Sequence, residues 1–294
     1  MTVASPLISA AELDAALKGA DPPTLLDIRW HLTSGPEHPE RPVGYDDYLR
    51  AHLPGATFVD LATELASSPS SEQGRHPLPT PEDFAETVAR WGVSGGQELV
   101  FYDDLGGMSA ARGWWLARHA GLPARMLDGG LAAWIRHGGE TTAGAAAPPS
   151  GTTDPAGPGW GHMPVLSADD AAALAADGVL LDARAGERYR GETEPMDPRA
   201  GHIPGALSAP TAANLAHDGC FRDADHLAAR FADLGATPGV RVGAYCGSGV
   251  TASHQVFALA VAGIDAALYP GSWSQWSSDP ARPVAVGPLP DGAD

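Results

Sequence analysis

The sequence has 294 residues, of which 44% are hydrophobic and 18% charged, an ordinary globular composition that excludes a disordered chain. At about 150 residues per domain, this length predicts two domains with separate cores. Acidic residues outnumber basic ones by 36 to 18, and the resulting net charge of −18 would repel a phosphate backbone, so we expect no nucleic-acid partner.

The N-terminal segment 1–21 lacks the features of a targeting sequence. It has no basic start, and Glu12 and Asp14 follow early. No uninterrupted apolar run reaches about 18 residues, the length that a membrane-spanning helix needs. We therefore expect a cytoplasmic protein that does not bind a membrane.

Short segments of the first half of the chain recur in the second half in the same order. "LLDIRW" returns as "LLDARA", and "LDGGLAAW" returns as "LYPGSWSQW", which places Trp134 and Trp276 at matching ends. The recurring pairs are 25–30 with 180–185, 51–56 with 201–206, 99–104 with 241–247, and 127–134 with 268–276. Such self-similarity indicates a tandem repeat.

The repeat and the composition between its copies define the expected domains. Residues 141–160 include "TTAGAAAPPSGTTDPAGPG", a stretch rich in Ala, Gly, Pro and Thr that is typical of a linker. We therefore expect one domain over residues 1–140 and a second over residues 161–294.

Within each half, short apolar strands alternate with helical patterns, for example over 108–121 and 168–178. This alternation predicts an α/β fold in which each domain has a mostly parallel sheet flanked by helices. In such sheets a ligand binds beyond the carboxyl ends of the strands, where the next turn opens into a helix.

Cys246 lies at a turn of this kind in the second half. The apolar run 240–245 predicts a buried strand before it, and the apolar spacing over 251–263 predicts a helix after it. Gly247 and Gly249 allow backbone N–H groups to point inward, and the helix N-terminus adds partial positive charge. The turn favours a thiolate, whereas the alternative is a small buried cysteine without chemistry.

These motifs together resemble the tandem-domain sulfurtransferases of the rhodanese family over nearly the whole chain. The resemblance rests on the duplicated "LLDIR"/"LLDAR" and "HLPGA"/"HIPGA" segments, on "DARAGERYRGETEP" (182–195), and above all on "CGSGVTA" (246–252). It implies two rhodanese-like domains and a persulfide on the nucleophile Cys246, without a cofactor. Asp103 stands at the cysteine position of the first domain, so the resemblance implies that residues 1–140 are catalytically inactive.

Cysteine phosphatases share this sheet topology and form the main enzymatic alternative. They need an arginine six positions after the cysteine to bind the phosphoryl oxygens. Ala252 occupies that position here, which disfavours phosphatase chemistry. A non-enzymatic sulfur carrier or binding module, which would load sulfur on Cys246 with little turnover, stays open.

The loop sequence "CGSGVT" is similar to that of the 3-mercaptopyruvate sulfurtransferases. Members that use thiosulfate carry basic residues after the cysteine, which suit a doubly charged donor, whereas Gly247 and Ser248 follow here. The resemblance therefore implies 3-mercaptopyruvate as the sulfur donor, with thiosulfate as the alternative. The sulfur would pass to a thiol acceptor, such as a thioredoxin-like protein, or to cyanide.

The resemblance also implies a substrate-binding site on the second domain. Arg188 matches an arginine that binds the donor carboxylate, although a structural ion pair is its alternative role. A second arginine of the family falls at Met196, and we expect Arg199 to replace it. The loop that carries the cysteine completes the expected site with Gly247, Gly249, Val250 and Thr251.

A proton relay of Ser248, His76 and Asp60 is a further implication of the resemblance. The segment "HLPGATFVD" supplies Asp60, and "GRHPLP" supplies His76. Such a relay would deprotonate the donor thiol or protonate the departing enolate. The alternatives are a turn aspartate, an exposed loop histidine and a serine that stabilises its own loop.

Other polar residues have structural interpretations. Cys220 lies in the polar loop "AHDGCFRD", where we expect an inert thiol. His52 and His202 recur at matching places in the two halves, which favours a structural role. The two cysteines are too few for a disulfide framework. Neither belongs to a cluster with zinc-ligand spacing, so we expect no structural metal.

Overall fold

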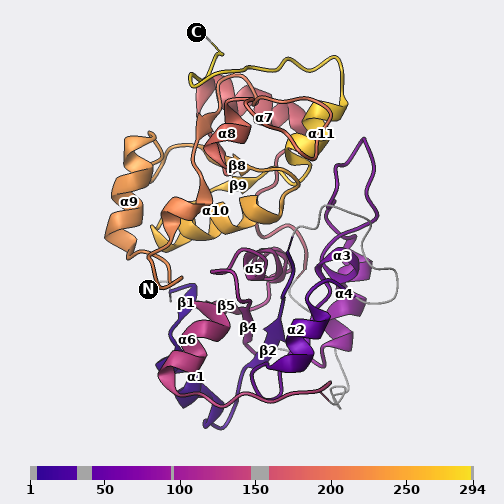
Figure 1. Cartoon of the computed structure of the whole chain (residues 1–294), viewed down its shortest axis with the longest axis vertical. Helices are drawn as coiled ribbons and strands as arrows, with labels where there is room; N and C mark the ends of the chain where they lie inside the picture. Colours follow the sequence, from indigo (N-terminus) through magenta and orange to yellow (C-terminus); the bar gives the residue numbers. More distant parts are fainter. Residues whose placement is uncertain (1–4, 32–41, 94–95, 147–158, 293–294) are drawn as a thin grey trace. The chain divides into compact units, whose positions relative to one another are not determined.

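The computed structural model describes residues 5–31, 42–93, 96–146 and 159–292, so most of the predicted linker 141–160 falls outside the described residues. The chain divides into two compact units (Figure 1). Unit 1 comprises Met1–Ser67, Pro79–Met163 and His217–Phe221. Unit 2 comprises Ser68–Leu78, Pro164–Ala216 and Arg222–Asp294.

Two short segments belong to the unit that does not contain their neighbours in the chain. Ser68–Leu78 comes from the first half of the sequence and belongs to unit 2, and His217–Phe221 belongs to unit 1. The internal repeat contains no signal for this exchange. It bears on function because the first of these segments includes His76, one of the predicted relay residues.

Unit 1 contains a five-stranded sheet in the order β1-β5-β4-β2-β3, and its strand pairs are parallel. The strands are β1 (Leu7–Ile8), β2 (Thr24–Asp27), β3 (Thr57–Phe58), β4 (Leu99–Tyr102) and β5 (Ala124–Leu127). The helices are α1 (Ala10–Leu17), α2 (Tyr45–Arg50), α3 (Leu61–Glu64), α4 (Pro81–Arg90), α5 (Ala110–His119) and α6 (Gly130–His137).

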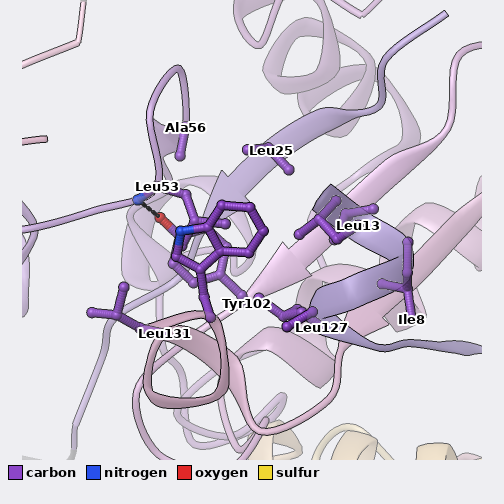
Figure 2. Packing of buried hydrophobic residues seen from close by; sticks show 11 residues of the cluster. Ile8, Leu13, Leu25, Leu53, Ala56, Tyr102, Leu127 and Leu131 are labelled. Carbon is purple, nitrogen blue, oxygen red and sulfur yellow. Dashed lines mark hydrogen bonds between the residues drawn. The ribbon is translucent and has the colours of Figure 1, made fainter. Parts of the chain in front are cut away.

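A cluster of buried apolar side chains packs between this sheet and its helices (Figure 2). Leu25 and Tyr102 come from the strands, whereas Leu13 and Leu131 come from α1 and α6. The Tyr102 hydroxyl accepts a hydrogen bond from the Leu53 N–H at 3.1 Å, so its one polar atom is satisfied inside the cluster. Burial on both faces explains why β4 reads as a continuous apolar run in the sequence.

Unit 2 contains a four-stranded sheet in the order β7-β6-β8-β9, again with parallel pairs. The strands are β6 (Val179–Asp182), β7 (Leu207–Ser208), β8 (Val242–Tyr245) and β9 (Ala267–Leu268). The helices are α7 (Ala168–Asp177), α8 (Gly186–Tyr189), α9 (Ala224–Asp233), α10 (Val250–Val261), α11 (Ser272–Ser278) and the 3-10 helix η1 (Thr211–Asn214). The two parallel sheets with flanking helices confirm the predicted fold class.

The elements around Cys246 follow the predicted strand and helix closely. The segment 240–245 contains β8 (Val242–Tyr245), whose four residues are buried. The helical pattern 251–263 forms α10, which begins at Val250 and ends before Gly263. Gly263 has a φ of 73°, a left-handed conformation that terminates helices and that glycine adopts without strain. Cys246 therefore lies between the carboxyl end of β8 and the start of α10.

The repeat is preserved down to individual hydrogen bonds. His52 stacks on the Tyr48 ring with centroids 3.9 Å apart, and His202 stacks on Tyr189 at 3.8 Å. Each histidine places its Nδ1 within 3.0 Å of the carbonyl of its own tyrosine, at 2.9 and 2.8 Å. These matched contacts support the structural role expected for the two histidines.

In the part of the chain that the structure describes, none of the helices combines the length and the apolar character that crossing a membrane requires.

Candidate active site

The Cys246 loop occupies residues 246–249 of unit 2. The Cys246 side chain is buried, and its sulfur accepts a hydrogen bond from the Gly249 N–H at 3.2 Å. Gly249 has a φ of 84°, and a Cβ at this residue would lie 2.5 Å from the Pro270 carbonyl oxygen. Glycine is therefore required here by both the backbone angle and the close approach. The N–H donor stabilises negative charge on the sulfur, as a nucleophile needs.

The first turn of α11 holds this loop from the other side. The Ser272 hydroxyl accepts a hydrogen bond from the Cys246 N–H at 3.1 Å and donates one to the Tyr269 carbonyl at 2.8 Å. The Trp273 and Ser274 N–H groups donate to the carbonyls of Cys246 and Gly247, both at 2.9 Å. The backbone position of the cysteine is thus fixed by several bonds from one helix.

Ser272 adopts a left-handed conformation that serine rarely takes. Its φ is 53°, and it is the one non-glycine residue with a positive φ in the described part of the chain. The equivalent residue of unit 1 is Gly130, with a φ of 55°. The Leu131 N–H donates to the Asp103 carbonyl in unit 1 as Trp273 does to Cys246 in unit 2. Unit 2 therefore tolerates strain at a serine whose hydroxyl bonds to the Cys246 backbone.

Segment 68–78 supplies two further side chains to this site in unit 2. The Nδ1 atom of His76 lies 2.8 Å from Ser248 Oγ, and both side chains are largely buried. Arg75 precedes His76, and its N–H donates to Ser274 Oγ at 3.1 Å. The structure therefore brings together Cys246, Ser248 and His76 of the predicted site residues.

Asp60 belongs to unit 1, where it forms the N-cap of α3. Its carboxylate accepts hydrogen bonds from the Ala62 N–H at 3.1 Å and from the Thr63 hydroxyl at 2.7 Å. Such a cap stabilises the start of a helix by about 1 kcal/mol. These bonds give Asp60 a structural role, and its membership of the relay stays a prediction.

Arg188 extends from α8 to the Cys246 loop, where its guanidinium faces Gly247. Its Nη2 lies 2.6 Å from Glu194 Oε1 and 3.2 Å from Asp197 Oδ2. Arg75 pairs with the other oxygen of Asp197. Burial raises the pKa of Asp197, and the positive charge of Arg75 opposes that shift. Two guanidinium groups and two carboxylates thus surround the approach to Gly247.

Arg199 binds backbone carbonyls and not the Cys246 loop. Its guanidinium donates to the carbonyls of Trp276, Ser277, Asp279 and Arg282 at 2.5–2.9 Å. A cation at this place interacts favourably with the carbonyls at and just beyond the C-terminal end of α11. These contacts give Arg199 a structural role, and its substrate-binding role stays a prediction.

The loop of unit 1 that corresponds to the Cys246 loop surrounds a carboxylate. Asp103 is buried and accepts hydrogen bonds at 2.8–3.0 Å from the N–H groups of Leu105, Gly107, Ser109 and Ala110. Burial raises the pKa of Asp103, and the four N–H donors oppose that shift. The anion-binding turn of unit 1 is therefore filled by its own side chain.

Cys220 lies in a setting that disfavours a thiolate. Burial, followed by the charges of Asp128 and Asp218, raises the pKa of Cys220 to about 11. Arg136 Nη2 is 3.7 Å from its sulfur and only partly offsets these effects. The geometry agrees with the inert thiol expected from the sequence.

Sequence patterns missed Arg75, Asp197 and Ser272 as residues of the site. Arg75 had a signal, because it adjoins His76 in "GRHPLP". No local sequence pattern showed that segment 68–78 belongs to unit 2.

Among the described residues, the side chains of His, Cys, Asp and Glu form no cluster of three that could hold a metal ion.

Comparisons with known proteins agree with this architecture. The model of the Rhodanese-like domain matches residues 9–137 and again residues 167–279. "Putative thiosulfate sulfurtransferase SseB" of Mycobacterium tuberculosis is 46% identical, with 96% of this chain and 97% of the relative aligned. "Probable 3-mercaptopyruvate sulfurtransferase" of Pseudomonas aeruginosa is 44% identical, with 96% and 98% aligned.

A solved structure shows the same fold over the length of both proteins. The crystal structure of SseA from Escherichia coli, described as a 3-mercaptopyruvate sulfotransferase with the rhodanese fold, has a TM-score of 0.76 and 30% sequence identity. The match covers 92% of this chain and 99% of that one. Both halves of the repeat, the parallel sheets and the Cys246 loop are therefore accounted for by one family. The chain belongs to the rhodanese family, with two rhodanese-like domains in tandem.

Proposed function

We propose that the protein is a sulfurtransferase that moves sulfane sulfur from 3-mercaptopyruvate to an acceptor through a persulfide on Cys246. One observation carries the proposal: the Cys246 sulfur lies in an N–H-lined loop at the carboxyl end of β8, next to the His76–Ser248 pair. The names of the relatives, which cover nearly the whole chain, support sulfur transfer as the reaction. The catalytic domain would be residues 161–294, with residues 1–140 as a non-catalytic partner joined by the linker 141–160.

The first half-reaction forms the persulfide. The Cys246 thiolate attacks the sulfur of the donor, a new S–S bond forms, and the C–S bond of the donor breaks. The electron pair of that bond remains with the three-carbon fragment, which leaves as the enolate of pyruvate. The proton of the donor thiol is transferred through Ser248 Oγ and His76 Nδ1 and finally protonates the enolate carbon.

The second half-reaction returns the enzyme to its starting state. An acceptor thiolate or cyanide attacks the outer sulfur of the persulfide, and the Cys246 thiolate leaves. A thioredoxin-like protein is a suitable thiol acceptor, because its low-pKa thiol provides a thiolate at neutral pH. No step needs an external oxidant or reductant. In the first half-reaction the donor carbon takes up the electron pair as the two sulfurs reach the persulfide level, and in the second the acceptor replaces Cys246 on the outer sulfur. We expect this reaction to run in the cytoplasm.

Thiosulfate is the second candidate donor, and a specific observation favours it. The loop residues Gly247 and Ser248 are neutral, but Arg75 and Arg188 lie against Gly247 in unit 2. Guanidinium N–H donors therefore reach the loop from outside it, and they would bind a dianion as well as a carboxylate. We favour 3-mercaptopyruvate because Ser248 and His76 can handle a thiol proton that thiosulfate lacks.

The test is a steady-state comparison of Cys246→Ser and Cys220→Ser with the unmodified protein, using both donors and one common acceptor. Cys246→Ser should abolish transfer while the circular dichroism spectrum stays unchanged, because a hydroxyl cannot hold a persulfide. Cys220→Ser should retain the activity. Substantial transfer by Cys246→Ser would refute the mechanism, and a clear preference of the unmodified protein for thiosulfate in kcat/KM would refute the choice of donor.

A further inference from the structure

Arg75 is a charged residue of the site with no role assigned so far. Its backbone N–H donates to Ser274 Oγ at 3.1 Å, and the Ser274 N–H donates to the Gly247 carbonyl at 2.9 Å. Gly74, just before it, approaches α11 so closely that a Cβ there would lie 2.6 Å from the Gly271 carbonyl oxygen. The backbone of Arg75 is thus tied to the loop of Cys246.

The side chains of Arg75 and Arg188 converge on one point of this loop. A methyl group placed on Gly247 would lie 3.0 Å from Arg75 Nη2 and 3.4 Å from Arg188 Nη1. Guanidinium groups bind carboxylates through paired N–H donors. Two of them meeting beside the residue that follows the nucleophile form a binding site for an anionic group.

Arg75 has donor capacity that its ion pair does not use. Its Nη1 pairs with Asp197, whose side chain is 2% exposed, whereas the Arg75 side chain is 25% exposed. The Nε atom of Arg75 is buried and has no hydrogen-bond partner among the described residues. Nη2 is the nitrogen that faces Gly247. The ion pair with Asp197 therefore fixes the guanidinium and leaves other N–H groups for a ligand.

Arg75 also lies near the position at which the family has a second arginine and this chain does not. The family resemblance places a second arginine at position 196, where this chain has Met196. Met196 and Arg75 line the same cavity, with a volume of about 270 Å³. Asp197, the residue after Met196, is the ion-pair partner of Arg75. The positive charge that Met196 does not supply to this cavity is thus supplied by Arg75 from segment 68–78.

We propose that Arg75 is a substrate-binding residue that, together with Arg188, binds the carboxylate of the sulfur donor in place of an arginine at position 196. The identity of that donor rests on the proposed function. The anion-binding pair beside Cys246 does not, and it can be tested without any sulfur transfer. The pair makes the site selective for anionic donors over neutral ones of the same shape.

The experiment compares two alkylating reagents that differ in one group. Iodoacetate carries a carboxylate, and iodoacetamide carries a neutral amide in its place. In both reactions the Cys246 thiolate displaces iodide from carbon, so the ratio of the two rates cancels any change in the thiol itself. Dividing this ratio by the same ratio for free glutathione removes the intrinsic difference between the reagents. The result measures carboxylate binding next to Cys246, provided that the rates are followed on the Cys246 peptide.

Arg75→Met should lower the normalised ratio about tenfold. One charge-assisted contact corresponds to a factor of roughly 10 to 100, and the partial exposure of Arg75 places it at the lower end. Arg190→Met is the matched control, because Arg190 of the same unit pairs with the exposed Glu192, and the ratio should stay unchanged. Adding Met196→Arg to Arg75→Met should restore most of the ratio. If Arg75→Met does not fold, Arg75→Gln, which can still donate to Asp197, gives the same test.

An unchanged ratio in the folded Arg75 variant would overturn the proposal. Sulfur transfer is then measured with 3-mercaptopyruvate and with mercaptoacetone, its analogue with a methyl group in place of the carboxylate. This comparison distinguishes carboxylate binding by Arg75 from a purely structural role of Arg75. If Arg75→Met lowers kcat/KM equally for both donors, Arg75 has only a structural role and the proposal fails. If the alkylation ratio falls but the unmodified protein uses neither donor, the anion site stands and the proposed function fails.

Discussion

Replacing Ser272 with Gly or with Ala separates the strain at this residue from the bonds that its hydroxyl makes. Its φ of 53° costs an L-residue roughly 1–2 kcal/mol, and glycine avoids most of that cost. Both replacements remove the hydroxyl, which leaves the buried Cys246 N–H without its acceptor, at a cost of about 1–3 kcal/mol. Ser272→Ala should therefore be destabilised by about 1–3 kcal/mol, and Ser272→Gly by about 1 kcal/mol less.

Urea denaturation at equal m-values measures this difference. Both variants should also lose sulfur-transfer activity to a similar extent, because both lose the tether on the Cys246 backbone, although their stabilities differ. Gly130→Ala in unit 1 is the matched control for backbone strain without a hydroxyl. It should be strongly destabilising, because the new Cβ would lie 2.2 Å from the Asp103 carbonyl oxygen. An Ala variant as stable as the Gly variant would refute the strain argument, and two fully active variants would refute the tether.

Three further predictions address residues outside the nucleophile itself. His76→Ala should slow transfer from 3-mercaptopyruvate more than transfer from thiosulfate, because only the first donor brings a thiol proton. Asp103→Asn, which keeps one acceptor oxygen for the N–H groups around it, should alter neither rate by more than about twofold, and equal small effects of the two replacements would remove the relay. Because the pKa of Cys220 is about 11, only the minor thiolate fraction of Cys220 reacts with iodoacetamide below that pH. The rate of Cys220 alkylation, followed by peptide mapping, should therefore rise about tenfold per pH unit between about pH 8 and pH 9.5. A plateau of this rate within that range would contradict the assigned environment. Arg199→Met should lower the midpoint of urea unfolding, since four backbone carbonyls lose a guanidinium donor, with little change in KM for either sulfur donor. A rise in KM at unchanged stability would instead support the substrate-binding role of Arg199.

Local patterns predicted the elements that carry Cys246. Val242–Tyr245 contains no charged residue because β8 is buried on both faces, and Gly263 marked the end of α10 because a left-handed residue terminates a helix. Local patterns therefore placed the cysteine at the carboxyl end of a buried strand. These features depend only on residues that are neighbours in the chain, which is why they can be predicted from the sequence.

Features that depend on contacts between distant segments were not predictable in this way. Segment 68–78 belongs to unit 2 through contacts such as Arg75 with Ser274, and no periodic pattern encodes a contact between residues so far apart. The sequence likewise contains no sign that the Arg199 guanidinium donates to carbonyls at the end of α11, about 80 residues further along the chain. The left-handed angle of Ser272 likewise follows from the packing of α11 on the loop and not from its residue type.

Intact-mass spectrometry of the protein after brief exposure to 3-mercaptopyruvate, without acceptor, detects the Cys246 persulfide itself. Sulfur transfer through Cys246 predicts a mass increase of one sulfur atom per chain, located on the Cys246 peptide, with release of one pyruvate per chain and loss of the added mass when cyanide or a thiol is supplied. No added sulfur, or sulfur located on Cys220, would contradict it.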